Sequence, residues 1–244
     1  MKALFHTILY KPIFNALVVL YGVLGGNAGF AIIVLTVALK ALLYPLMSSS
    51  IKAQKSLQEL QPKLNELKKK HGSDKQALAQ ETMEIYKENK VNPLSSCLPL
   101  IIQLPILLAL YWVLRDGLGT TDFSLLYGFV ESPGVLDPHF FGLNLSEPIL
   151  LLAVLAGAAQ YWQGKMLAVT RPPKSAGAGG RDEDMMAMMN KQMIYFMPVL
   201  TVIIGTRLPG GLALYWFIST FLTALQQLVI FKKHDKDKKI ESQA

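Results

Sequence analysis

Long apolar blocks separated by charged stretches dominate the hydrophobic pattern of this chain. A helix needs about 20 mostly apolar residues to cross a bilayer, and five blocks approach this length. They occupy residues 28–47, 94–115, 148–164, 193–208 and 212–231. The third and fourth are short, and local thinning of the bilayer is one way to accommodate them. The pattern predicts an all-α polytopic membrane protein with a core of five spanning helices.

Residues 1–27 are also apolar, but they carry His6, Lys11 and Pro12. They lack a charged start followed by a small-residue cleavage site, so a removed signal peptide is not expected. We interpret this segment as an N-terminal interfacial amphipathic helix, with a sixth span as the alternative.

Residues 48–93 carry leucines at helical spacing, Leu57, Leu60, Leu64 and Leu67, and the pattern breaks at residues 68–74 before a second helical run. This predicts a helical hairpin, with Pro62 in the first turn of its opening helix and therefore at a break from the first span. Three further connections complete the chain. They are an outer loop at 116–147, a flexible loop at 165–192 that is rich in Gly, Pro, Ser and Ala, and a basic tail at 232–244.

Lysine and arginine distribution predicts the orientation, because positive loops stay on the cytoplasmic side. The segments 48–93, 165–192 and 232–244 hold 19 of the 24 Lys and Arg residues, whereas 116–147 holds five acids and none of them. We expect the N-terminus outside and the C-terminus inside, which agrees with an odd number of spans. The hairpin, the flexible loop and the tail are then cytoplasmic.

Overall composition excludes several classes of protein. The chain is 52% hydrophobic and 17% charged, with mean hydropathy +0.34 and net charge +7. Its apolar residues lie in blocks, which argues against an ordinary DNA-binding domain. One cysteine, Cys97, and four histidines far apart encode neither an intrachain disulfide nor a metal site. No nucleophile with a base, intramembrane carboxylate pair or glycine-rich phosphate loop is evident, so we expect no cofactor and no enzyme.

Lys40 is the one charge deep inside a predicted span, roughly 18 Å from the outer end and roughly 10 Å from the inner end. Such a cation costs a few kcal/mol and usually marks function. All 17 acids lie outside the spans, which argues against a proton relay and favours a hydrated cavity or a transient partner. Snorkelling of Lys40 to the inner interface is the simpler alternative.

Further polar residues at membrane depth predict a hydrophilic groove open to the cytoplasm. Thr36 lies one turn before Lys40 and shares its face. The other members are Gln103 on the second span and Thr220, Thr223, Gln226 and Gln227 on the fifth.

Residues 92–112 (NPLSSCLPLIIQLPILLALYW) closely resemble the second core span of the YidC/Oxa/Alb membrane insertases, and residues 208–216 (LPGGLALYW) resemble the beginning of their last span. With residues 35–45 (LTVALKALLYP) and the hairpin, the resemblance covers roughly residues 12–232. It implies five core helices around a hydrophilic groove that is closed outside, open to the cytoplasm and lipid, and receives client transmembrane segments. The expected function is insertion and folding of membrane proteins without nucleotide hydrolysis.

The resemblance also implies roles for individual residues. Lys40 takes the place of the family's groove arginine, which keeps the charge but loses the bidentate geometry of a guanidinium. The other client-binding groove positions that it implies are Thr36, Gln103, Leu104, Leu107, Ile204, Arg207, Tyr215 and Trp216. Arg207 replaces what is commonly an aromatic or apolar residue, and it could instead reach the outer headgroups. The residues that it implies for receiving clients or the ribosome are Lys68, Lys69, Lys70, Lys232 and Lys233.

The resemblance implies nascent membrane proteins and membrane lipids as partners, with the ribosome and the Sec translocon as further candidates. The basic tail could equally be a topological anchor or contact anionic lipid. A monomer in the bacterial inner membrane is expected, in a compact form without a large outer domain. Two alternatives remain open: a chaperone or scaffold for helices already inserted, and a channel or transporter, which the absence of paired repeats argues against.

Overall fold

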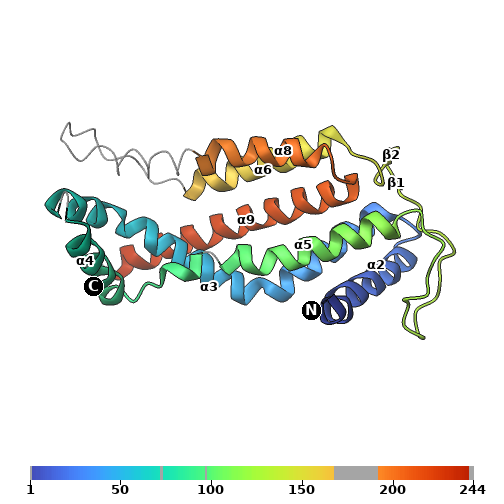
Figure 1. Ribbon diagram of the computed structural model, residues 1–244, viewed down its shortest axis with the longest axis horizontal. Coiled ribbons are helices and arrows are strands. Elements are labelled where there is room, and N and C mark those ends of the chain that lie inside the picture. The colour runs from blue at the N-terminus through green and yellow to red at the C-terminus, as the bar shows by residue number, and fades with distance from the viewer. Residues whose placement is uncertain (1, 72–73, 97, 168–191, 242–244) are drawn as a thin grey trace.

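The computed structural model describes residues 2–71, 74–96, 98–167 and 192–241, and most of the predicted flexible loop at 165–192 lies outside them. The described chain forms an elongated helical bundle whose long helices run roughly along one axis (Figure 1). We call the end that carries the 116–147 segment the outer end, and the end that carries helix α4 the inner end.

Two long helices, α3 (Ala28–His71) and α9 (Gly210–Glu241), form the spine of the bundle and run side by side in the same direction (Figure 1). Three described segments are long and apolar enough to cross a membrane: His6–Val23, Ala28–Leu67 and Gly210–Lys236. The first is the segment that we interpret as interfacial, and that interpretation stays a prediction.

The expected break at Pro62 is wrong, because α3 continues without interruption through Pro45 and Pro62. A proline inside a helix removes one backbone hydrogen bond and usually costs about 3 kcal/mol or more. Pro62 is exposed, so water can satisfy the carbonyl that loses its partner. Leu60 and Leu64, 6% and 5% exposed, anchor the helix on the opposite face. The first predicted span and the first arm of the hairpin are therefore one continuous helix.

The remaining helices pack around this spine. Helix α5 (Leu98–Gly117) follows the short 3-10 helix η2 (Pro93–Ser96), and α6 (Leu150–Leu167) leads back toward the inner end. The π-helix η3 (Gln192–Phe196) precedes α8 (Met197–Gly205), which ends three residues before the predicted boundary at 208. Helix α4 (Lys75–Glu88) folds back beside the last turns of α3 (Figure 1).

Small residues allow α6 and α8 to approach closely. A Cβ added to Gly157 would lie 2.6 Å from the Val202 side chain and 3.0 Å from the Pro198 carbonyl oxygen. A Cβ added to Gly205 would lie 2.7 Å from the Cβ of Ala153. Glycine at helix interfaces is a common solution in membranes, where association depends on close van der Waals contact.

The N-terminal segment is helical from Lys2 and comprises α1 (Lys2–Phe5), the π-helix η1 (His6–Tyr10) and α2 (Lys11–Val23). Asn15 of α2 is buried and ties the outer loop to this helix. Its amide donates to the carbonyl of Leu125 at 3.1 Å and accepts from the backbone N–H of Tyr127 at 2.7 Å.

The outer loop also contains a small β-hairpin that the all-α prediction missed. Strands β1 (His139–Phe140) and β2 (Leu143–Asn144) pair antiparallel, and Phe141 and Gly142 turn between them with φ of 48° and 79°. Two residues with positive φ match the twist of paired strands. The hairpin docks on α3, where the Phe140 ring occupies the space that a side chain on Gly29 would fill.

The largest fully buried apolar side chains concentrate at the outer end. This cluster joins α2, α3, α5 and α9 to the outer loop, and its members include Leu17, Ile32, Leu114, Leu136, Leu145 and Leu212. Along α5, the four most buried side chains all lie in the outer half, whereas Ile101 and Leu104 of the inner half are 60% and 49% exposed; the four are Ala109, Leu110, Val113 and Leu114. The bundle is thus densely packed at its outer end and more open along the inner half of α5.

Candidate functional site

Lys40 lies on α3 and reaches across to α9, where its Nζ donates a hydrogen bond to Oγ1 of Thr223 at 2.9 Å. Thr223 in turn donates to the carbonyl of Ser219 at 2.9 Å. Lys40 is 12 residues into α3 and Thr223 is 13 residues into α9, which corresponds to roughly 18 Å and 20 Å of helix. A Cβ on Gly211 would lie 3.1 Å from Ile32, and Lys40 is eight residues past Ile32 whereas Thr223 is twelve past Gly211, so the ammonium reaches toward the inner end as it crosses to α9.

A polar stripe on one face of α9 surrounds this contact. Tyr215, Ser219, Thr223 and Gln226 follow at spacings of four, four and three residues, which place side chains on the same side of a helix. The Gln103 amide of α5 donates to the hydroxyl of Tyr215 at 2.5 Å. At the inner side, the Gln226 amide donates to Ser48 Oγ of α3 at 2.9 Å. The stripe therefore links α9 to both α3 and α5.

Thr36, predicted beside Lys40, has a different environment. It is fully buried, and its hydroxyl donates to the carbonyl of Ile32 in its own helix at 2.6 Å. Thr220 and Gln227 of α9 are also buried, at 8% and 1% exposure. Each follows a stripe residue by one position, which rotates it about 100° away from the stripe. The structure thus joins Lys40 and Gln103 to the stripe, whereas Thr36, Thr220 and Gln227 lie off it. Burial does not separate the two groups, because Tyr215 and Ser219 of the stripe are 3% and 4% exposed.

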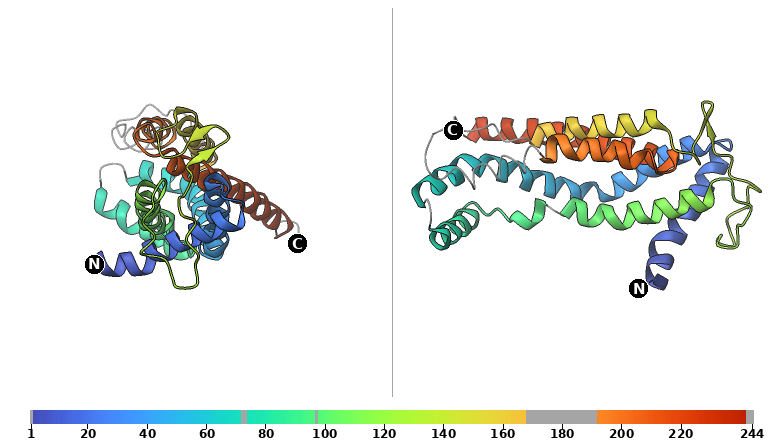
Figure 2. Two further views of the ribbon diagram at one scale, coloured as in Figure 1. Left: turned by 90° about the vertical axis from the view of Figure 1, so that its right-hand side faces the viewer. Right: turned by 45° about the horizontal axis from the view of Figure 1, so that its top comes forward.

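The predicted apolar wall residues lie on three helices, α5, α8 and α9. Leu104 of α5 is 49% exposed and Ile204 of α8 is 38% exposed, whereas Leu107 and Trp216 are half-buried. In the view of Figure 1, α8 lies above α9 and α5 lies below it, and Figure 2 shows the same bundle from two further sides. Arg207 is exposed in the turn that follows α8, where its N–H donates to the carbonyl of Ile204.

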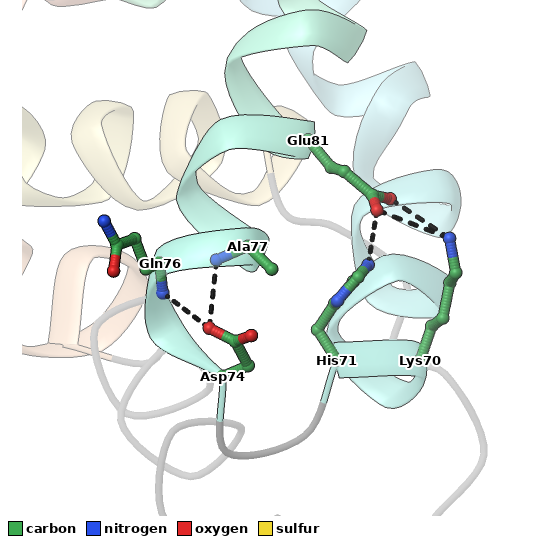
Figure 3. Close-up of polar contacts among 6 residues, drawn as sticks. All are labelled: Lys70, His71, Asp74, Gln76, Ala77 and Glu81. Carbon is green, nitrogen blue, oxygen red and sulfur yellow. Dashed lines mark hydrogen bonds and ion pairs between the residues drawn. The ribbon is translucent and has the colours of Figure 1, made fainter.

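The predicted reception lysines are only partly described. Lys70 is 68% exposed and pairs with Glu81 of α4 at 3.4 Å, and His71 contacts the same carboxylate at 2.7 Å (Figure 3). The hydrogen bond from His71, followed by that from Lys70, lowers the pKa of Glu81. Lys232 and Lys233 are exposed. The side chains of Lys68 and Lys69 lie outside the part of the structure that is described.

The tip of the hairpin is further ordered by a helix cap. The carboxylate of Asp74 accepts hydrogen bonds from the backbone N–H groups of Gln76 and Ala77, both at 3.1 Å (Figure 3). Capping satisfies donors that have no partner within the helix. Lys70 therefore belongs to a structured tip in which Glu81 joins the two arms.

Sequence reasoning missed a second contact between α3 and α9 at the inner end. Lys55 of α3 forms an ion pair with Asp235 of α9 at 3.1 Å, and Glu59 lies 3.3 Å from His234. The Lys55 ammonium also lies over the ring of Phe231, 5.1 Å from its centroid. The tail was interpreted from its net charge alone, and only a helical continuation of α9 to residue 241 brings these groups onto α3.

Comparison of the sequence with known proteins identifies the family of this chain. Residues 19–238 match the sequence model of the family described as 60Kd inner membrane protein. A Fusobacterium nucleatum protein named Membrane protein insertase YidC is 38% identical over 208 residues, which cover 85% of this chain and 88% of that protein.

Longer proteins of the same name are also similar. Those of Mannheimia succiniciproducens and Ectopseudomonas mendocina are 34% and 32% identical over 93% and 92% of this chain, which spans only 37% and 34% of their lengths. These matches confirm the resemblance to the YidC/Oxa/Alb insertases and the location in the bacterial inner membrane as a multi-pass protein. The chain belongs to the 60Kd inner membrane protein family, the family of the YidC membrane protein insertases.

Proposed function

We propose that this protein inserts transmembrane segments of client proteins into the inner membrane through a polar groove centred on Lys40, without nucleotide hydrolysis. The names of its relatives support the insertase function. The observation that carries the groove proposal is the contact between Lys40 and Thr223, a cation held across two long apolar helices by a neutral hydroxyl.

The partner of Lys40 determines what the site can do. Among the ion pairs of the described residues none includes Lys40, so its charge is not neutralised by a fixed carboxylate. A hydrogen bond between a charged and a neutral group contributes about 1.5–3 kcal/mol. A carboxylate in the translocated tail of a client would form a stronger, charge-assisted contact and could displace Thr223.

The polar stripe of α9 would lower the desolvation cost of a client's polar tail. Burial of an unpaired polar group costs a few kcal/mol, whereas the hydroxyl and amide groups of Tyr215, Thr223 and Gln103 offer replacement partners. The dense apolar cluster at the outer end would close the groove outside, and the short helix α8 would shorten the remaining barrier. A tail would thus cross only part of the bilayer unaided.

The client helix itself would leave along the exposed apolar residues of α5 and α8. Leu104 and Ile204 provide a surface as apolar as lipid, so a client helix gains nothing by remaining and can move into the bilayer. Leu107 and Trp216 would form the floor of this wall, and Arg207 would meet the client or the headgroups at the outer rim.

Charge distribution supports the orientation of this reaction. With the N-terminus outside and the C-terminus inside, α4, the tip at Lys70 and the exposed Lys232 and Lys233 all face the cytoplasm. These elements would receive nascent clients, and clustered lysines would also attract ribosomal RNA or anionic lipid. We propose a monomer that acts alone or with the Sec translocon.

The test is insertion of a single-span client with an acidic N-terminal tail into proteoliposomes that contain only this protein. Protease protection of the tail reports translocation. We expect protection with wild type and Lys40→Arg, loss with Lys40→Ala, and no change with the control Lys52→Ala, which alters an exposed lysine further along α3. Equal protection with Lys40→Ala would reject the groove charge. No protection with any folded variant would favour a chaperone for helices already inserted.

A further inference from the structure

A cavity of about 640 Å³ opens between the N-terminal segment and the outer end of α5. Phe5, His6 and Tyr10 line it from the N-terminal segment, and Trp112, Arg115 and Asp116 line it from α5. None of these residues belongs to the polar stripe or the apolar wall described above, so the cavity is separate from the proposed insertion groove.

One part of the lining is aromatic. The rings of Phe5 and Trp112 meet edge to face, with centroids 5.3 Å apart, and the rings of His6 and Tyr10 stack at 4.9 Å. Outside the cavity the apolar surface continues on both helices, because Leu4, Ile8 and Leu108 are 65%, 59% and 48% exposed. An apolar chain could therefore run from the cavity into the surrounding lipid.

The other part of the lining is a pair of opposite charges. Arg115 donates to Asp116 through Nε to Oδ1 at 2.6 Å and through Nη2 to Oδ2 at 3.0 Å. Each side chain is about half exposed, at 50% and 46%. A guanidinium carries five N–H donors and a carboxylate about four acceptor positions, so both groups keep capacity for a ligand. Such a pair offers a donor for a phosphate next to an acceptor for an ammonium group.

The position of the pair fits a lipid headgroup. Arg115 and Asp116 lie in the last turn of α5, which ends at Gly117 where the chain passes into the outer loop. Tyr10 and Trp112 have an apolar ring and a polar edge, which suits the depth of the headgroups. The cavity thus presents charge toward the aqueous side and aromatic surface toward the bilayer.

We propose that this cavity binds a phospholipid with a zwitterionic, ethanolamine-type headgroup in the outer leaflet. The phosphate accepts hydrogen bonds from Arg115, the ammonium group donates to Asp116, and one acyl chain passes Phe5 and Trp112 toward Leu108. A headgroup that carries only negative charge would place no cation on Asp116 and would bind less well. This inference goes beyond client insertion and does not depend on Lys40.

Native mass spectrometry of the full chain in detergent, with equal amounts of phosphatidylethanolamine and phosphatidylglycerol, tests the proposal. We expect wild type to retain phosphatidylethanolamine preferentially, and Asp116→Asn to reduce that preference about tenfold, the effect of losing one charge-assisted contact. Arg115→Gln removes the donor to the phosphate that both lipids carry, so it should lower the retention of both. Lys52→Gln is the control, because it removes an exposed cation of α3 outside the cavity and should leave the preference unchanged.

Circular dichroism of each variant establishes that the helices persist. Trp112→Ala offers an independent variant, since it removes the aromatic floor and should lower retention of both lipids without altering the preference between them. Equal retention of the two lipids by wild type, an unchanged preference in Asp116→Asn, or retention of neither lipid would each overturn the proposal.

Discussion

The ammonium of Lys40 and the hydroxyl of Thr223 meet at 2.9 Å, on two helices that run in the same direction and at nearly the same distance from their outer ends. Helix α9 begins beside Ile32 and not beside the start of α3, so the lysine stem crosses between the helices and reaches toward the inner end. A cation held in this way stays at membrane depth. Its charge is not neutralised, because its partner is a hydroxyl and not a fixed carboxylate.

Thr223→Val should separate the structural role of this contact from its functional role. Valine has nearly the same shape but accepts no hydrogen bond, so Lys40 loses its partner while the packing of α3 on α9 is retained. We expect a loss of about 1.5–3 kcal/mol in stability and continued insertion of acidic-tailed clients. Thermal unfolding and the proteoliposome assay measure the two effects.

Insertion that fails with Thr223→Val, while the protein remains folded, would contradict the idea that the hydroxyl is an exchangeable partner. Lys52→Ala serves as the control, because it alters an exposed side chain further along α3. This variant should leave both stability and insertion close to those of wild type.

The candidate site was only partly predictable from the sequence. A lysine in an apolar run is conspicuous, and Gln103 was found in the same way. The partner of Lys40 was not identified, because Thr220, Thr223 and Gln226 share one helix whose rotation depends on packing with α3 and α6. Ser219 and Ser48 were missed although the spacing from Tyr215 to Gln226 contains the signal, since serine in a helix often bonds only to its own backbone.

Gly157→Ala should weaken the packing between α6 and α8. The new methyl group would lie 3.0 Å from the carbonyl oxygen of Pro198, which belongs to the backbone and cannot move without shifting α8. Overpacking of this kind costs about 1–3 kcal/mol. We expect a lower unfolding temperature in detergent. Gly128→Ala is the control, because nothing lies within 4 Å of its added Cβ, and an equal effect of both changes would reject the explanation.

The fold was predicted best where the hydrophobic pattern is long. The helices α3, α5, α6 and α9 needed only block length, whereas the break expected at Pro62 ignored the apolar contacts of Leu60 and Leu64 that keep the helix continuous. The hairpin at His139–Phe140 gave no periodicity to detect, because a strand of two residues contains no alternation. Tertiary contacts with α3 at Gly29 determine it instead.

Acid should loosen the tip of the hairpin. Contacts with His71 and then Lys70 lower the pKa of Glu81, so the carboxylate form is favoured by the folded state. Its contribution is present above the ordinary pKa of 4.5 and is lost as the pH falls through the lowered value. Hydrogen exchange of α4 amides should therefore be slower in wild type than in Glu81→Gln at neutral pH, and the difference should vanish in acid.

The control for this prediction is Glu84→Gln, which removes another carboxylate of α4 that is exposed. It should exchange like wild type throughout the pH range. A difference between wild type and Glu81→Gln that persists unchanged below the lowered pKa would show that the side-chain shape, and not its charge, joins the two arms of the hairpin.

Asn15→Ala should release the outer loop from α2. Asn15 is 3% exposed, and its loss leaves the carbonyl of Leu125 and the N–H of Tyr127 without the amide that they share. An unpaired buried group costs about 1–3 kcal/mol, which raises the open population of the loop at least about fivefold. The loop 116–147 contains no Lys or Arg but does contain Phe123 and Tyr127, so chymotrypsin reports its opening. Glu131→Gln, an exposed change in the same loop, should leave cleavage unaltered, and equal rates for Asn15→Ala and wild type would show that the apolar contacts of the loop suffice to hold it on α2.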